Sequence, residues 1–119
     1  MKVKDFEKIV HQRLVHCEKL LCSKGEEYSR CGDRLHNLKA AARMKNTDKF
    51  EAIYGMWMKH IVSVHDMIQD ARQGILPSRK LIADKLSDNI NYNLLLEGLF
   101  EEDIRSNLLE GDKLQCELA

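Results

Sequence analysis

The chain has 119 residues and a mass of 13.8 kDa, a length typical of one domain. Nineteen Lys and Arg balance nineteen Asp and Glu, so the formal net charge at pH 7 is zero. This balance disfavours a nucleic-acid partner, because nucleic-acid binders usually carry a basic excess, and it equally disfavours an acidic mimic of DNA. One proline and six glycines leave few breaks, as long helices require. Composition therefore predicts a single helical domain over residues 1–119.

The beginning of the chain has no apolar stretch of signal-peptide length, and no window approaches the roughly 18 apolar residues of a membrane span. We therefore expect a cytoplasmic protein with no membrane partner. None of the four cysteines forms a C-x-x-C pair, which favours buried free thiols in a reducing compartment. One zinc-binding set can be imagined, although its spacing matches no common zinc motif: His11, His16, Cys17 and Cys22.

Apolar residues recur every three or four positions from residue 5 to residue 23, which predicts one amphipathic helix. Lys24-Gly25 is a typical helix end, because a cation suits the carboxyl end of a helix and glycine adopts positive φ. The segment 26–32 has no periodicity and is predicted to be a connection. Asp33 is then a candidate N-cap for a shorter helix that reaches Met44.

Two longer helices follow. Asp48, with a glutamate three residues later, resembles a capping box, and apolar residues continue this third helix towards Gly74. Ser78 is a candidate N-cap for a fourth helix whose apolar face reaches Phe100. Because the connection is short, the two helices should pack antiparallel. The predicted fold is an all-α bundle of three to four helices with one long antiparallel pair. Residues 104–119 form a loose tail that either packs as a small helix or frays.

Two polar stripes run beside the apolar faces of the third and fourth helices. The first stripe consists of Lys59, Ser63, Asp66 and Asp70, and the second of Asp84, Asp88, Asn91 and Tyr92. Facing carboxylates in a helical bundle can bind a divalent cation. Counted from the loop, Asp66 and Asp88 lie at comparable depths, with an offset of about 9 Å at 1.5 Å per residue. The alternative, which spacing alone favours, is a solvated boundary with surface ion pairs.

The segment 24–39 is rich in residue types that bind ligands, with two glycines, a tyrosine and closely spaced basic and amide residues. Such a connection offers donors for phosphate groups and an aromatic face for a base. It contains neither a Walker pattern nor G-x-G-x-x-G, and the alternative is an ordinary connection between helices. His60 lies on the apolar face of the third helix, where a lone histidine is typically a core residue with both nitrogens hydrogen-bonded.

Three motifs occur in order along the chain. They are K-G-x-E-Y-x(4)-D-R-L-x-N-x-K-x-A-A at 24–42, K-H-x-x-S-x-x-D at 59–66 and K-x-x-D-x-x-N-Y-x-x-L-L at 85–96. This combination resembles small, largely uncharacterised proteins encoded by phages and prophages of Gram-positive bacteria, which implies the cytoplasm of a bacterial host. More distantly, the helical layout resembles the all-α nucleoside triphosphate pyrophosphohydrolase superfamily, the MazG-like and dimeric dUTPase-like enzymes.

The resemblance to the pyrophosphohydrolases implies Mg²⁺ as a cofactor, held by an E-x-x-E pair on one helix and an E-x-x-D pair on the next. In this chain the first pair falls on Lys59 or His60 with Ser63, and the second on Lys85 and Asp88. Of the four carboxylates in the family pattern, this chain keeps only that of Asp88, so Mg²⁺ binding should be weakened. With two neighbouring carboxylates as substitutes, the candidate metal ligands are Asp66, Asp84 and Asp88. We therefore expect a nucleotide-binding protein with weak or absent hydrolysis.

The candidate ligand-binding residues combine the segment 24–39 with both stripes. They are Lys24, Glu27, Tyr28, Asp33, Arg34, Asn37, Lys59, His60, Ser63, Asn91 and Tyr92. The alternative function is a small phage interaction protein that inhibits a host enzyme or defence system, directly or by sequestering a nucleotide signal. A third possibility is a structural homo-oligomer without a ligand. The third helix is apolar on more than one side, which predicts a homo-oligomer and favours a dimer.

Overall fold

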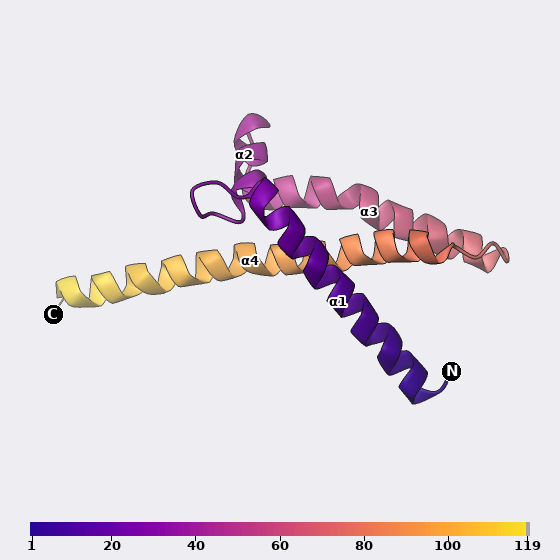
Figure 1. The fold of residues 1–119 in the computed structure, drawn as a ribbon. Coiled ribbons are helices and arrows are strands. Elements are labelled where there is room, and N and C mark those ends of the chain that lie inside the picture. Colours follow the sequence, from indigo (N-terminus) through magenta and orange to yellow (C-terminus); the bar gives the residue numbers. More distant parts are fainter. Residues whose placement is uncertain (119) are drawn as a thin grey trace.

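The computed structural model describes residues 1–118, which form four helices. They are α1 (Val3–Tyr28), α2 (His36–Met44), α3 (Lys49–Arg72) and α4 (Arg79–Leu118). α3 and α4 lie side by side and run in opposite directions, α1 crosses α4, and the short α2 packs near the beginning of α3 (Figure 1). The predicted all-α bundle with a long antiparallel pair is confirmed.

Local capping explains where α3 and α4 begin. The Asp48 carboxylate accepts hydrogen bonds of 2.9 Å from the backbone N–H groups of Phe50 and Glu51, which would otherwise have no partner in the first turn. Ser78 Oγ accepts a hydrogen bond of 3.1 Å from the backbone N–H of Leu81. Gly74 follows α3 with a φ of +84°, a conformation that glycine adopts without steric cost. The predicted beginnings of both helices and the predicted end of α3 are confirmed.

The end of α1 differs from the prediction. Gly25 does not stop the helix, which continues to Tyr28. A Cβ on Gly25 would lie 3.6 Å from Nε of Arg34, so the missing side chain lets Arg34 approach α1. The chain reverses later, at Cys31 and Gly32, where φ is +52° and +75°. The connection is therefore shifted by three residues, from the predicted 26–32 to 29–35, and keeps its predicted length.

The beginning of α2 also differs from the prediction. Asp33 does not cap this helix, because Leu35 occupies the N-cap position and has no capping side chain. Instead, Asp33 Oδ1 accepts a hydrogen bond of 2.9 Å from the backbone N–H of Leu35, inside the preceding turn. The other carboxylate oxygen of Asp33 takes part in an ion-pair network, and this network replaces the cap.

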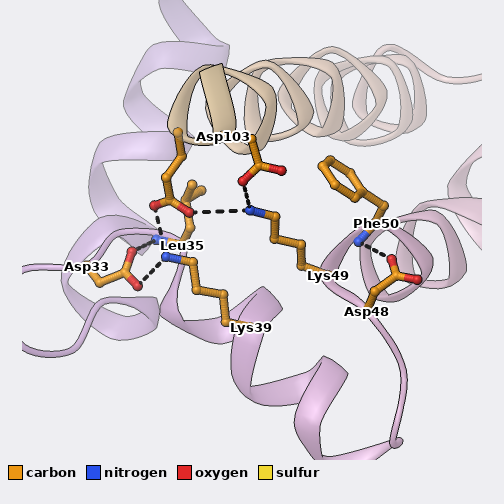
Figure 2. A network of polar contacts seen from close by, with 8 residues as sticks. Asp33, Leu35, Lys39, Asp48, Lys49, Phe50 and Asp103 are labelled. Carbon is orange, nitrogen blue, oxygen red and sulfur yellow. Dashed lines mark hydrogen bonds and ion pairs between the residues drawn. The ribbon is translucent and has the colours of Figure 1, made fainter. Parts of the chain in front are cut away.

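Three helices and the turn before α2 are joined by this network, which Figure 2 shows. Lys39 Nζ lies 2.8 Å from Oδ2 of Asp33 and 2.9 Å from Oε2 of Glu102. Lys49 Nζ lies 3.6 Å from Oε1 of Glu102 and also pairs with Asp103. The two lysines therefore connect the turn before α2, α2 itself and the beginning of α3 to one stretch of α4.

The core is small and lies where α2, α3 and α4 meet, around Leu38, Ile53 and Leu99. A second buried contact forms where α1 crosses α4. There Ser87 is completely buried and its Oγ accepts a hydrogen bond of 2.9 Å from Nη1 of Arg13. Cys17 is buried beside it. The other three cysteines are exposed, so the prediction of buried thiols is wrong for them.

The tail forms neither a separate small helix nor a frayed end. α4 continues without a break to Leu118, and every residue of 104–118 is exposed. This projection makes the molecule long, with a radius of gyration of 18.7 Å, whereas a compact domain of this length has about 13.5 Å. Within residues 1–118, no helix is long and apolar enough to cross a membrane.

Candidate functional site

A cavity of about 170 Å³ lies where all four helices converge. Seven of the eleven predicted ligand-binding residues line it, and so does one of the predicted metal ligands. They are Lys24, Tyr28, Arg34, Asn37, His60, Asn91, Tyr92 and Asp88. The rest of the lining is apolar and includes Met56 and Leu95. The cavity therefore joins an apolar interior to polar and cationic groups from segments far apart in the sequence.

The late end of α1 positions the cationic side of the cavity. Because the helix continues past Gly25, Lys24 and Tyr28 stay on α1 and face the cavity, and the turn that follows brings Arg34 back against the same helix. Among residues 1–118, neither Lys24 nor Arg34 has an ion-pair partner, and neither donates a side-chain hydrogen bond. Two unpaired cations beside a cavity favour an anionic ligand.

Two buried polar atoms of cavity-lining residues lack hydrogen-bond partners. Asn91 is only 8% exposed, and within the described chain its Oδ1 has no hydrogen-bond partner. The same holds for Nδ1 of His60, so the expectation that both ring nitrogens are hydrogen-bonded is wrong. This nitrogen lies 3.4 Å from Oδ2 of Asp88, within ion-pair distance but without hydrogen-bond geometry. An unsatisfied buried polar group costs about 1–3 kcal/mol, so both atoms are places where a ligand would gain a partner.

Aromatic rings form one wall of the cavity. The Tyr92 ring contacts two others: its centroid is 6.1 Å from that of Trp57, with the planes nearly parallel at 9°, and 5.2 Å from that of His60. Asn89 holds this wall together, because its Oδ1 accepts a hydrogen bond of 2.9 Å from Nε1 of Trp57 and its Nδ2 donates one of 3.1 Å to the His60 carbonyl. Sequence reasoning missed Asn89 and the stacking of Trp57.

Burial sets the protonation state of two lining groups. It lowers the pKa of His60, and although Asp88 opposes this change, the charges of Lys59, Lys85 and Lys24 lower the pKa further. His60 is therefore neutral near pH 7. Burial and the Asp88 carboxylate raise the pKa of Tyr92. The phenol therefore stays protonated and can act as a hydrogen-bond donor.

Four predicted ligand-binding residues do not line the cavity. Glu27 and Lys59 are exposed, and Ser63 Oγ donates a hydrogen bond of 2.9 Å to the Lys59 carbonyl of its own helix. Asp33 belongs to the ion-pair network described above. These residues share motifs with cavity residues but point elsewhere, so their place in the candidate site is not supported by the geometry.

The three predicted metal ligands are not brought together. His60, not Asp66, lies opposite Asp88. His60 and Asp88 are each fourteen residues from Gly74, so the offset of six residues between Asp66 and Asp88 keeps these two carboxylates apart. Asp66 and Asp84 are exposed and line no part of the cavity. Within the part of the chain that the structure describes, no three His, Cys, Asp or Glu side chains form a group that could hold a metal ion. The donor set does not fit a protein-held Mg²⁺, which needs several oxygen ligands.

Comparisons with known proteins give no relative for this chain. No family model matches it, and neither a curated protein nor a solved structure does. The functional argument therefore depends on the cavity itself.

Proposed function

We propose that this cavity binds a nucleotide, with the base inside the cavity and the phosphates beside Lys24 and Arg34. One observation carries the proposal. Asn91 and His60 line the cavity, and the buried atoms Asn91 Oδ1 and His60 Nδ1 have no hydrogen-bond partner within residues 1–118. A base edge carries donors and acceptors in one plane and can satisfy both groups, while the ring contacts Tyr28 and Tyr92.

The size of the cavity supports this division of the ligand. A volume of about 170 Å³ lies below the 300–1,000 Å³ of sites that enclose a whole small molecule. One ring system is therefore enclosed, and a charged group attached to it stays at the rim. Lys24 is exposed and Arg34 half-buried, so both cations can bind phosphate oxygens without losing their hydration completely.

The ligand is bound without efficient hydrolysis. Asp88 is the one carboxylate that lines the cavity, whereas metal-dependent hydrolysis of a nucleoside triphosphate needs several carboxylates around Mg²⁺. Binding without turnover suits a protein that sequesters a nucleotide signal in a bacterial cytoplasm. This is the route by which the small phage and prophage proteins that the motifs resemble would inhibit a host defence system. We further propose that the protein is a homo-oligomer, and most simply a dimer.

Thermal unfolding with a panel of ribo- and deoxynucleoside triphosphates, uridine and pyrophosphate tests the proposal. A ligand at a hundred times its Kd stabilises the fold by about 2.7 kcal/mol, a shift of roughly 10 °C in Tm for a domain of this size. We expect a shift with at least one triphosphate and smaller shifts with uridine or pyrophosphate alone. No shift with any triphosphate would contradict the proposal.

Two variants locate the site. Asn91→Leu removes an unsatisfied buried group, so Tm without ligand should stay unchanged or rise while the ligand shift is lost. Asn93→Leu is the matched control, because Asn93 is exposed two residues further along α4 and should keep the full shift. Equal ligand shifts in the two variants would show that the cavity is not the binding site.

A further inference from the structure

Two apolar stripes are exposed, one at each projecting end of the molecule. The first lies on the N-terminal half of α1 and consists of Val3, Phe6, Ile9, Val10 and Leu14. The second lies on the tail of α4 and consists of Phe100, Ile104, Leu108, Leu114 and Leu118. Each of these residues is at least 41% exposed. At 100° per residue, each set falls within about 140° of its helix circumference and so lies along one face.

The exposed area is larger than a monomer of this mass should have. The accessible surface is 9356 Å², whereas a folded monomer of 13.8 kDa exposes about 6,600 Å². The excess of about 2,700 Å² is more than three times the roughly 800 Å² that each partner buries in a standard stable interface. The chain therefore has enough uncovered surface for a large interface with a partner.

The two ends carry opposite net charge. Residues 1–16 contain four Lys or Arg and two Asp or Glu, a net charge of +2. Residues 100–118 contain six Asp or Glu and two Lys or Arg. Glu102 and Asp103 are already paired with lysines of α2 and α3, which leaves a net charge of −2 on the remaining residues. Contact between the α1 stripe and the tail stripe would bring opposite charges together, whereas contact between two like stripes would not.

The two stripes cannot meet within one chain. α1 is held against α4 at Ser87 by Arg13 and Cys17. From this crossing the N-terminal half of α1 and the tail of α4 extend in different directions (Figure 1). Covering both stripes therefore requires another molecule, and an apolar basic surface together with an apolar acidic one is what a second copy of this chain offers.

We infer that two copies form a reciprocal dimer in which the α1 stripe of each protomer packs on the tail stripe of the other. A two-fold axis then makes the same contact twice and covers both stripes. This inference specifies the interface of the homo-oligomer proposed above and is independent of the ligand in the cavity.

Single substitutions test the interface by light scattering at micromolar concentration. The wild type should have twice the mass of 13.8 kDa. Leu108→Glu should shift the protein to the monomer, and Leu109→Glu is its matched control. Leu109 is 63% exposed against 65% for Leu108 but lies on the side of α4 opposite the centre of the tail stripe. Circular dichroism should show unchanged helicity in both variants, because neither side chain is packed within its own chain. A monomeric wild type, or equal dissociation by both substitutions, would overturn the inference.

A mixing experiment tests the reciprocal pairing. Phe6→Glu damages only the α1 stripe and Leu108→Glu only the tail stripe, so each variant alone should be monomeric. A mixture of the two should form heterodimers, because the intact α1 stripe of one meets the intact tail stripe of the other. Pairing of α1 with α1 and tail with tail predicts no recovery, which would overturn the inference. A third variant, Tyr54→Glu, distinguishes failure of this interface from failure of the proposed homo-oligomer. If Tyr54→Glu yields monomers while Phe6→Glu and Leu108→Glu stay dimeric, the dimer forms through α3 instead.

Discussion

Replacing Lys39 with methionine should destabilise the fold measurably at neutral pH and hardly at all in acid. Met keeps most of the side-chain length but removes the ammonium that lies 2.8 Å from Asp33 and 2.9 Å from Glu102. Exposed ion pairs contribute about 0.2–1 kcal/mol each. The Lys39 side chain is only 27% exposed and serves two carboxylates, so we expect Lys39→Met to lower the free energy of unfolding by about 1–2 kcal/mol. For a domain of this size this is a fall of roughly 4–8 °C in Tm.

The remaining partners limit the loss. Glu102 still has Lys49 at 3.6 Å, and Asp33 still accepts the hydrogen bond from the backbone N–H of Leu35. Neither carboxylate is therefore left as an isolated buried charge, a case that would cost 3–5 kcal/mol. An effect above about 3 kcal/mol would show that Lys39 supports the packing of α2 in a further way.

The pH dependence identifies the effect as electrostatic. The hydrogen bond from Lys39 lowers the pKa of Asp33 below its ordinary value of 3.8. The stabilisation is therefore complete above that value and is lost as pH falls through the lowered pKa. The same contacts raise the pKa of Lys39 above 10.5, so the stabilisation persists throughout the neutral range and is lost a second time as pH rises through this raised value. Urea unfolding at pH 7 measures the effect of Lys39→Met where the stabilisation is present, and urea unfolding at pH 2 measures it in acid.

A double-mutant cycle with Glu102→Gln completes the test. If the two side chains interact directly, the cycle should give a coupling free energy of about 0.5–1 kcal/mol at pH 7. An equal loss of stability for Lys39→Met at pH 7 and pH 2, with no coupling to Glu102, would refute an electrostatic role and leave only packing of the lysine chain.

Two further predictions concern local structure. Gly55→Ala should raise the free energy of unfolding by about 0.5–1 kcal/mol, because Gly55 is inside α3 and a Cβ there meets no atom within 4 Å. Gly74→Ala should instead lower it by about 1 kcal/mol, because Gly74 has a φ of +84°. Urea unfolding measures both changes, and changes of equal sign would contradict this reasoning. A thiol reagent should react quickly with Cys22, Cys31 and Cys116, which are exposed, and with Cys17 only after unfolding. Rapid reaction of four thiols in the native protein would show that α1 is not packed on α4 as described.

Local signals in the sequence were sufficient for the beginnings of α3 and α4 and for the end of α3. Asp48 and Ser78 bond to backbone groups two or three residues away, so their role depends only on neighbouring chain. Gly25 is the opposite case. Whether a glycine ends a helix or makes room for another segment depends on what packs against it, and Arg34 reaches Gly25 only after the chain has turned at Gly32.

The candidate site was predictable where one motif supplied several residues from one helix face. Asp88, Asn91 and Tyr92 come from such a motif and all line the cavity. The register between α3 and α4 follows from equal counts on each side of Gly74, which pair His60 with Asp88 as the structure does. Asp66 was expected opposite Asp88 only because the offset of six residues between them was treated as small. Counting residues does not give the side-chain contacts between the helices, so the Asn89 contact with Trp57 was missed.

The last prediction concerns catalysis, and it depends on charge. The pKa of His60 is lowered by the charges of three lysines, Lys59, Lys85 and Lys24. The surroundings of Asp88, which faces His60, therefore carry excess positive charge. At 4 Å and an effective dielectric of 20, one ammonium repels a cation by about 4 kcal/mol per unit charge, as much as one carboxylate attracts it. Asp88 alone therefore cannot hold Mg²⁺ against its hydration. The thermal shift produced by a bound triphosphate should survive excess EDTA, and pyrophosphate release with Mg²⁺ or Mn²⁺ should stay far below the ordinary enzymatic range of about 1–10³ s⁻¹. Turnover within that range, abolished by Asp88→Asn and unchanged in Asp84→Asn, would show that Asp88 organises a metal centre after all.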